Sequence, residues 1–275
     1  MSRTNEKSWI VEHYDRVSPY YYSLWGQHLH HGYWIRGDES KEIAQQQLVE
    51  LLAHHARVRP GAEVLDIGCG FGGSSLYLAQ NYGAHPTGIT ISPVQVEMAN
   101  RAARAANAHA RFLLMDAECM SFESPFDLLW SVESISHYQD VGKFFASAVR
   151  FLKPGGTFAL TDWFKRDNLS STETRKFISP IEKGMFVELH TMDDYARHLA
   201  ANGLEITHRE ALNAQCARTW ELGLDIIKDK AFWALAAESG SQFVTYLKSF
   251  RAMRAGFASG SFVYGLMVAV APQLS

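Results

Sequence analysis

Cysteines are few in this chain, and long clusters of one charge are missing. Cys69, Cys119 and Cys216 are odd in number and widely spaced, so they predict neither a disulfide framework nor a zinc site. They indicate a reducing compartment, and we expect the cytoplasm. The 26 basic residues nearly balance the 29 acidic ones and form no long basic run, which argues against a nucleic-acid partner.

Long apolar segments are missing as well. The longest one near the end, 262–271, is far shorter than the roughly 20 residues that span a bilayer. Residues 1–7 are polar and carry no apolar segment of a signal peptide. We therefore expect no stable membrane insertion. The 275 residues, 47% of them hydrophobic, suffice for one large α/β domain, and they carry no signal for an oligomeric state.

What the sequence does have is a regular alternation of short apolar strands with helical segments. Strands are expected at 62–67, 85–91, 110–115, 126–131 and 156–163, and helices at 74–82, 93–106 and 139–152. Gly155 and Gly156 supply the turn before the fifth strand. This alternation predicts a doubly wound α/β fold, and two further strands at 204–209 and 261–271 complete a mostly parallel sheet of seven strands.

We expect a single domain over 1–275. Residues 1–60 form an N-terminal helical cap with helices at 6–24 and 39–58, residues 61–163 form a ligand-binding core, and residues 164–275 complete the sheet. Thr191 and Asp194 predict a capped helix start. Residues 212–258 are too long for a plain loop and are rich in aromatics, including Phe243, Tyr246 and Phe250. We interpret them as a helical lid, with an extension of the core as an equal alternative.

The most informative run is Val64–Gly73, VLDIGCGFGG. It reads as a short apolar strand that holds Asp66, followed by a turn in which Gly68, Cys69 and Gly70 precede two more glycines. Side chains in such a turn would keep a ligand away from the backbone. The helix that follows offers free N–H groups at its start. The run therefore predicts a nucleotide pocket, with a ligand-free glycine connection as the alternative.

Asp66 indicates which nucleotide the pocket binds. Gly68, Gly70 and Gly73 also satisfy the dinucleotide pattern, but such a site places an acid about 20 residues further on, and the second strand ends without one. A carboxylate within the turn would repel a pyrophosphate and would suit an ammonium group. S-adenosylmethionine (SAM) carries an ammonium, a sulfonium and no phosphate. The pattern therefore favours SAM over a nicotinamide cofactor.

Polar residues follow the next two strands at the edge where open α/β sheets bind ligands. Thr90 and Gln95 offer neutral donors and acceptors for ribose hydroxyls. Asp116 can accept from an adenine amino group while the backbone beside Ala117 serves a ring nitrogen, although a helix N-cap is an alternative role for Asp116.

The fourth strand ends in Ser131, Glu133 and His137. His137 can act as a general base, orient a nucleophile or hold the cofactor, with Glu133 in support; a satisfied buried histidine is the alternative.

The densest histidine cluster is His28–Trp34. It has no carboxylate at ligand spacing, so we expect no metal there. We expect instead a loop that closes over the cofactor, with Tyr33 or Trp34 as its wall.

Together these motifs resemble the class I SAM-dependent methyltransferases of the γ-tocopherol methyltransferase type. The resemblance rests on five segments and the region near Arg254–Phe257, and the five are His13–Asp15, Trp25–Tyr33, Asp66–Gly73, Gly88–Gln95 and Trp130–His137. It implies that Tyr14 and Tyr33 contact SAM, and that Ser131 lies near its methionine part. Ser136 stands where the plant tocopherol enzymes and the cyclopropane synthases tend to have a glutamate.

The expected activity is methyl transfer from SAM to a small, largely apolar acceptor at carbon, nitrogen or oxygen, such as a phenolic, isoprenoid or amine compound. Positioning and exclusion of water carry much of such a rate. The alternative is a SAM-binding protein without methyl transfer, either a cyclase or a regulatory module. The expected catalytic residues are His137 and Glu133, and the expected cofactor-binding residues are Tyr14, Tyr33, Asp66, Gly68, Cys69, Gly70, Thr90, Gln95, Asp116, Ala117 and Ser131.

Overall fold

The computed structural model describes residues 4–225, 228, 230, 232–233 and 241–273. Its strands are β1 (Glu63–Ile67), β2 (His85–Thr90), β3 (Arg111–Leu114), β4 (Phe126–Val132), β5 (Leu152–Lys165), β6 (Glu205–Ala211) and β7 (Phe262–Val270). Its longer helices are α1 (Thr4–Trp25), α2 (Lys41–Ala56), α3 (Gly73–Tyr82), α4 (Pro93–Ala105), α5 (Val141–Ala148), α8 (Met192–Ala201), α10 (Arg218–Asp225) and α12 (Ser241–Ser259). The shorter helices are α6 (Ser171–Glu173), α7 (Ser179–Met185) and α9 (Asn213–Cys216).

The strands form one seven-stranded sheet in the order β3-β2-β1-β4-β5-β7-β6. The pairs from β3 to β5 are parallel, and β7 runs antiparallel to both β5 and β6. The predicted doubly wound, mostly parallel fold is confirmed. The strand order reverses between β1 and β4, and open α/β sheets bind ligands beyond the carboxyl ends of strands at such a point.

Two apolar layers hold helices on the faces of the sheet. Along β4, Leu128 and Trp130 pack in the layer that contains α2, whereas Leu129 between them packs in the layer that contains α5. This alternation follows from the two-residue period of a strand. Both faces of the sheet are therefore buried, as the near-continuous apolar strands predict.

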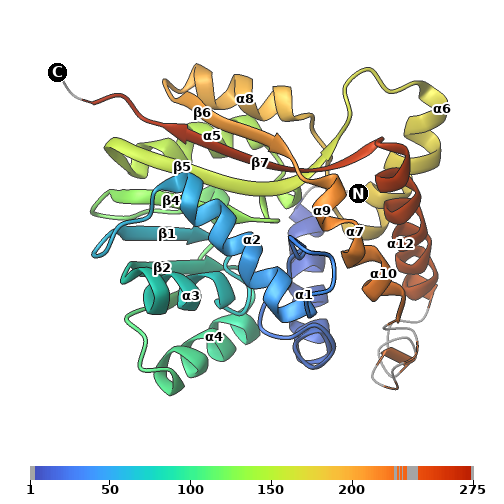
Figure 1. Cartoon of the computed structure of the whole chain (residues 1–275), viewed down its shortest axis with the longest axis horizontal. Coiled ribbons are helices and arrows are strands. Elements are labelled where there is room, and N and C mark those ends of the chain that lie inside the picture. Colours follow the sequence, from blue (N-terminus) through green and yellow to red (C-terminus); the bar gives the residue numbers. More distant parts are fainter. Residues whose placement is uncertain (1–3, 226–227, 229, 231, 234–240, 274–275) are drawn as a thin grey trace.

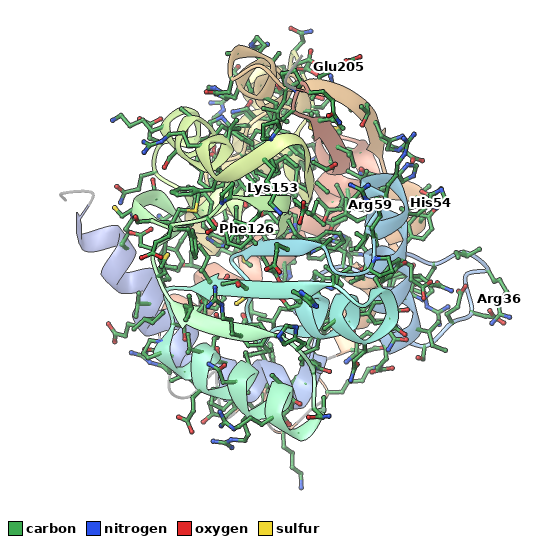
Figure 2. All side chains as sticks on the ribbon, turned by 90° about the vertical axis from the view of Figure 1, so that its left-hand side faces the viewer. Arg36, His54, Arg59, Phe126, Lys153 and Glu205 are labelled. Atoms are coloured by element: carbon green, nitrogen blue, oxygen red, sulfur yellow. The ribbon has the colours of Figure 1, made fainter. Side chains whose placement is uncertain are left out.

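The helices divide between the faces of the sheet and one of its ends. In Figure 1 the strands run across the view, and α1, α7, α10 and α12 gather beyond one end of the sheet. Figure 2 shows the opposite edge, where Phe126 and Glu205 begin β4 and β6. The gathered helices thus lie at the carboxyl edge of β1 and β4, where a ligand is expected.

Several helix boundaries follow from local capping. Thr191 and Asp194 form the predicted capping box at α8. The Ser40 side chain caps α2 by accepting from the backbone N–H of Ile43. The wider α2 prediction, 39–58, was too long because Arg57 adopts a left-handed conformation and ends the helix.

The structure corrects the sequence prediction around β5. The helix predicted over 139–152 is α5 and a short 3₁₀ turn, and β5 already begins at Leu152, where it pairs with Phe126. Gly155 has a positive φ of 71°, and a shift of register between Phe126 and Leu128 accommodates the irregular stretch. The glycine pair is therefore a feature within a strand that is longer than predicted.

None of the helices in the described part of the chain combines the length and the hydropathy that crossing a bilayer requires.

Candidate active site

A cavity of about 490 Å³ lies at the carboxyl edge of the sheet. Its wall is formed by α1, the loop at 27–31, the ends of β1 to β4, and segments of α7, α10 and α12. The volume is within the range of roughly 300–1,000 Å³ that small-molecule sites occupy. The wall residues come from distant parts of the sequence, so the cavity exists only in the folded chain.

The glycine turn after β1 lines the cavity with Gly68, Cys69 and Gly70. Only Gly70 leaves room for a ligand, because a Cβ there would meet no atom closer than Leu29 Cδ1 at 3.6 Å. At Gly68 a Cβ would collide with Ser134, and at Gly72 with Phe112. At Gly73 a Cβ would meet the Gln27 carbonyl oxygen at 2.7 Å. The prediction that all the glycines clear space for a ligand was therefore wrong for these three, and Gly68 and Gly72 are also required by positive φ angles of 78°.

Asp66 lies at the base of the cavity and is 2% exposed. Its Oδ2 accepts a hydrogen bond of 2.6 Å from the Ser75 hydroxyl of α3. Burial raises the pKa of Asp66 to about 7, although the bonds from Ser75 lower it. A cationic group placed against this carboxylate would favour its charged form, so the site fits the ammonium group of an amino acid.

Thr90 and Gln95 also line the cavity, and their side chains are hydrogen-bonded to each other. The Thr90 hydroxyl donates to Gln95 Oε1 at 2.7 Å, and the Gln95 backbone N–H donates to the Ser92 hydroxyl at the start of α4. The Gln95 amide nitrogen lies 3.4 Å from the Ser18 hydroxyl. These contacts fix neutral polar groups next to β2, where the sequence analysis expected them.

Asp116 and Ala117 line the cavity beyond β3. Asp116 caps a 3₁₀ helix by accepting from the backbone N–H of Glu118 at 2.9 Å, so the N-cap that we gave as its alternative role is present. Its second oxygen lies 2.6 Å from Lys7 Nζ, and Lys7 also pairs with Glu118. This link ties the N-terminal helix α1 to the end of β3.

Two predicted cofactor residues, Tyr33 and Ser131, are not among the residues that line the cavity. Burial raises the pKa of Tyr33, and the charges of Glu210 and Cys216 raise it further. The backbone N–H of Tyr33 donates to the Ala44 carbonyl oxygen. Ser131 is fully buried behind Ser134, with 2.9 Å between the two hydroxyl oxygens. In this structure neither side chain is part of the cavity wall, and Tyr33 packs against the apolar core.

His137 lines the cavity with both ring nitrogens engaged. Nδ1 lies 3.2 Å from the Phe186 carbonyl oxygen, and Nε2 lies 3.2 Å from the Tyr14 hydroxyl. Because a carbonyl only accepts, Nδ1 carries the proton and Nε2 accepts from Tyr14. Burial lowers the pKa of His137, so this neutral form prevails near neutral pH.

Glu133 does not support His137 by contact, which corrects the sequence prediction. Its Oε1 accepts from the His31 backbone N–H, from His31 Nδ1 at 3.0 Å and from the Tyr264 hydroxyl at 2.7 Å. Its Oε2 accepts from Trp163 Nε1 at 3.0 Å. Burial would raise the pKa of Glu133, but His31 and these donors outweigh it and hold the pKa below its usual value.

The loop before α2 contributes the residues that sequence reasoning missed. His28, Leu29, His30 and His31 line the cavity, whereas Trp34 donates to the Glu39 carbonyl oxygen instead. The three histidines are all less than 9% exposed. The signal was present in the sequence as a dense histidine cluster, but we had expected the wall to come from the aromatics that follow it.

The remaining wall comes from the second half of the chain and is largely apolar, apart from Thr219 and Arg251. Its apolar members are Trp163, Met185, Phe186, Trp220, Phe232, Trp233, Leu247, Phe250 and Met253. Phe243 and Tyr246, which the sequence analysis assigned to the lid, lie outside the described side chains. The cavity therefore joins a polar half at the strand ends to an apolar half.

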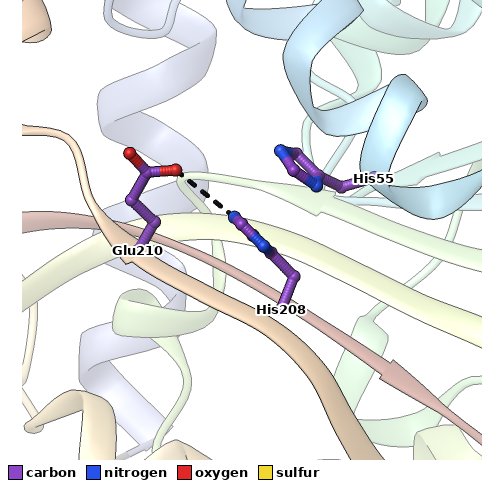
Figure 3. Close-up of side chains that lie close together, drawn as sticks. All are labelled: His55, His208 and Glu210. Carbon is purple, nitrogen blue, oxygen red and sulfur yellow. Dashed lines mark hydrogen bonds and ion pairs between the residues drawn. The ribbon is translucent and has the colours of Figure 1, made fainter.

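A separate group of ionisable side chains lies at the edge strand. His208 and Glu210 project from β6, and His55 from α2 lies against them (Figure 3). The two imidazoles stack with 3.6 Å between ring centroids and 16° between planes, and His208 Nε2 lies 3.3 Å from a Glu210 oxygen. Stacked rings present their nitrogens side by side and would have to rotate to converge on an ion. We interpret the group as a packing contact between α2 and β6.

The sheet order, the glycine turn and the acid within it are those of class I SAM-dependent methyltransferases. The mycolic acid cyclopropane synthetase family model matches residues 1–262. The chain therefore belongs to this family.

Similar proteins agree with this assignment. The 27-O-demethylrifamycin SV methyltransferase of Amycolatopsis mediterranei is 32% identical over 88% of this chain and 90% of its own length. The chloroplastic tocopherol O-methyltransferase of Arabidopsis thaliana is 31% identical over 96% of this chain and 82% of its own. The crystal structure of the mycolic acid cyclopropane synthase CmaA1 with SAH and CTAB superposes with a TM-score of 0.83 at 22% identity, covering 94% and 96% of the two chains.

The chain is thus a SAM-dependent methyltransferase that acts on small molecules, and SAM is its cofactor, as the sequence predicted. The site fits this cofactor on its own geometry. Gly70 leaves open space beside the turn, and the buried carboxylate of Asp66 faces the same cavity.

Proposed function

We propose that the protein transfers the methyl group of SAM to a small, largely apolar acceptor that binds in the apolar half of the cavity. The single observation that carries this proposal is the division of one cavity into a polar half at the strand ends and an aromatic half. The acceptor and the cofactor would then meet near Glu133 and His137. An apolar, closed site excludes water and holds the reacting atoms together, which is how such a displacement gains rate.

In the polar half, we propose that Asp66 binds the ammonium group of SAM and that Thr90 and Gln95 bind its ribose hydroxyls. Asp116 and Ala117 would contact the adenine, and the open side of Gly70 would let the cofactor approach the backbone. The contacts that support these roles are the fixed pair of Thr90 and Gln95 and the cap that orients Asp116.

We propose that His137 positions Tyr14 against the cofactor. Both nitrogens of His137 have partners, and the Tyr14 hydroxyl donates to one of them. Burial raises the pKa of Tyr14, which keeps this hydroxyl protonated. Among the roles considered for His137, these contacts favour orientation of a neighbour over direct proton transfer.

The helices α10 and α12 would cover the acceptor as a lid, within a single domain that spans the chain. Trp220 of α10 and Phe250 and Met253 of α12 line the apolar half and support this placement. We also propose a cytoplasmic location without a nucleic-acid partner, which is supported by the balanced charge and the free thiols of all three cysteines.

The test is calorimetric titration with SAM, followed by measurement of S-adenosylhomocysteine release with phenols, amines and prenyl compounds. We expect SAM to bind and at least one apolar acceptor to cause release. No binding at millimolar SAM would contradict the proposal. Binding without release from any acceptor would favour the alternative, a SAM-binding protein that does not transfer methyl groups.

A further inference from the structure

Among the residues that the structure describes, a buried nitrogen of His31 has no hydrogen-bond partner. Its Nδ1 lies 3.0 Å from Glu133 Oε1, and a carboxylate oxygen bonded in this way accepts, so Nδ1 carries the proton in the neutral ring. Nε2 therefore holds a lone pair, and it is buried without a partner. Buried polar atoms in native proteins are normally satisfied, so each exception requires an explanation.

Trp220 presents the complementary exception. Its Nε1–H is also buried and finds no partner within the described part of the chain. The His31 and Trp220 rings meet edge to face with 4.9 Å between centroids, and both residues line the cavity. The two rings that carry this unpartnered acceptor and this unpartnered donor thus lie against each other. A hydroxyl group, which donates one proton and accepts through its lone pairs, would satisfy both.

Glu133 lies where it would stabilise a positive charge that forms on His31 when His31 accepts a proton. Its two oxygens accept from His31, Tyr264 and Trp163 and leave it ionised in a dry environment. Glu133 also has a positive φ of 53°, a conformation that is uncommon outside glycine and that concentrates at functional sites. The Tyr264 ring stacks on the His31 ring with 4.4 Å between centroids, which fixes the plane of the imidazole.

We propose that neutral His31, oriented by Glu133, is the general base that takes the proton of a hydroxyl acceptor, and that Trp220 binds the same oxygen. This deepens the proposed function, on which it rests, by naming the acceptor as a phenol or alcohol. His137 differs from His31 in this respect, because both of its nitrogens already have protein partners.

The step balances as an O-methylation. The acceptor oxygen forms a bond to the methyl carbon while its proton moves to His31 Nε2. The bond between that carbon and the sulfonium sulfur breaks, and its electron pair stays on sulfur as neutral S-adenosylhomocysteine. The imidazolium, paired with Glu133, later returns the proton to water. General-base catalysis of this kind contributes about 10²–10⁴-fold.

The test compares acceptors of different acidity in two enzymes, the parent and His31→Asn. An asparagine amide can replace the Nδ1–H bond to Glu133 but has no atom at the Nε2 position. With 4-methylphenol at pH 7, we expect kcat to fall by about 10²–10⁴-fold while the Kd of SAM stays unchanged. With 4-nitrophenol, which ionises without help, we expect most of this loss to disappear. An equal loss on both phenols, or none on either, would contradict the base assignment.

Trp220→Phe provides a second variant in case the His31 change disrupts folding. With 4-methylphenol, it should raise the acceptor KM several-fold, because the acceptor loses about one hydrogen bond. The affinity for SAM should not change. Trp130→Phe is the matched control, because Trp130 Nε1 is likewise buried and unpartnered but does not line the cavity. Equal effects of the two changes would contradict the acceptor contact.

The outcomes also separate this inference from the proposed function. Methylation of amines or prenyl carbons with no turnover of any phenol or alcohol would overturn the hydroxyl assignment and leave methyl transfer intact. Absence of SAM binding in the parent enzyme would overturn both.

Discussion

The charge of Asp66 has opposite effects on the stability of the fold and on the binding of SAM. The carboxylate is fully buried and raised in pKa, so its charged form costs the fold stability, yet the same charge would attract the ammonium group of SAM. Asp66→Asn should therefore weaken SAM binding about ten- to a hundredfold, the value of a charge-assisted hydrogen bond, without lowering the free energy of unfolding at pH 8. Calorimetry and urea unfolding measure the two effects. The control variant is Asp127→Asn. Asp127 is a half-buried carboxylate at the amino edge of the sheet, where it pairs with Lys153.

The pH dependence of SAM binding follows from the same carboxylate. With a pKa of about 7 in the free protein, Asp66 is mostly protonated at pH 6 and mostly charged at pH 8. SAM affinity should therefore increase as pH rises through about 7 in the parent protein, and this increase should vanish in Asp66→Asn. The sign for folding is the reverse, because a raised carboxyl pKa means that the folded chain binds the extra proton and loses stability as pH rises. A pH-independent Kd in the parent would refute the assigned contact.

His137 is expected to affect the cofactor more than the chemistry. Without its Nε2, the Tyr14 hydroxyl loses a hydrogen bond, which typically contributes about 0.5–1.5 kcal/mol. His137→Ala should raise the KM of SAM about two- to tenfold and preserve the pH profile of kcat. Steady-state kinetics over pH 6–9 test this. A fall in kcat of about 10²-fold or more, with loss of its pH dependence, would instead make His137 the base.

The loop that connects α1 to α2 depends on neutral histidines. His30 Nδ1 donates to the His31 carbonyl, so its Nε2 accepts from His28 Nδ1 at 3.0 Å. Burial and the neighbouring His30 lower the pKa of His28 to about 3. Protonation of His30 at Nε2 would therefore break the hydrogen bond from His28, and burial disfavours a positive charge on His28.

Acid should destabilise the protein through this loop. The unfolded chain protonates His28 below about pH 6.5 while the folded chain does not, so the stability present above that pH falls by about 1.4 kcal/mol per pH unit. Urea unfolding at pH 7 and pH 5 should show a smaller difference for His28→Gln than for the parent. Substitution of the exposed His109 is the control. Because Asp66 acts in the opposite direction over this pH range, the test is the comparison with the parent: an equal change in stability between pH 7 and pH 5 in the parent and in His28→Gln would contradict this account.

The C-terminal helices should act on the acceptor alone. Phe250 of α12 lines the apolar half, so Phe250→Ala should raise the KM of the acceptor and leave the Kd of SAM unchanged. Phe122→Ala removes a half-buried phenylalanine that does not line the cavity and serves as the control. A loss of SAM affinity equal to the loss of acceptor binding would show that α12 does not cover the acceptor.

At the scale of the whole molecule, the polar half of the cavity wall was predictable from the sequence and the apolar half was not. Asp66, Thr90, Gln95 and Asp116 each follow or end a strand, and the parallel topology brings such positions to one edge. Contiguous motifs therefore carried enough information for this half.

The apolar half depends on residues that only folding brings together. Glu133 was paired with His137 because they are close in sequence, whereas its partner His31 lies 102 positions away. The misplacement of Tyr33 has a similar cause, since the chain turns between His31, which faces the cavity, and Tyr33, which faces Glu210. Side-chain direction within an irregular loop is not encoded in spacing.

The central claim is that one cavity brings SAM and a small apolar acceptor together for methyl transfer. The most direct measurement is mass spectrometry of the acceptor panel after incubation with SAM whose methyl group carries deuterium. We predict that an apolar phenol or alcohol gains the fully deuterated methyl group and that an equal amount of S-adenosylhomocysteine appears. SAM binding in the cavity with no labelled acceptor, or release of S-adenosylhomocysteine without label transfer, would contradict the account.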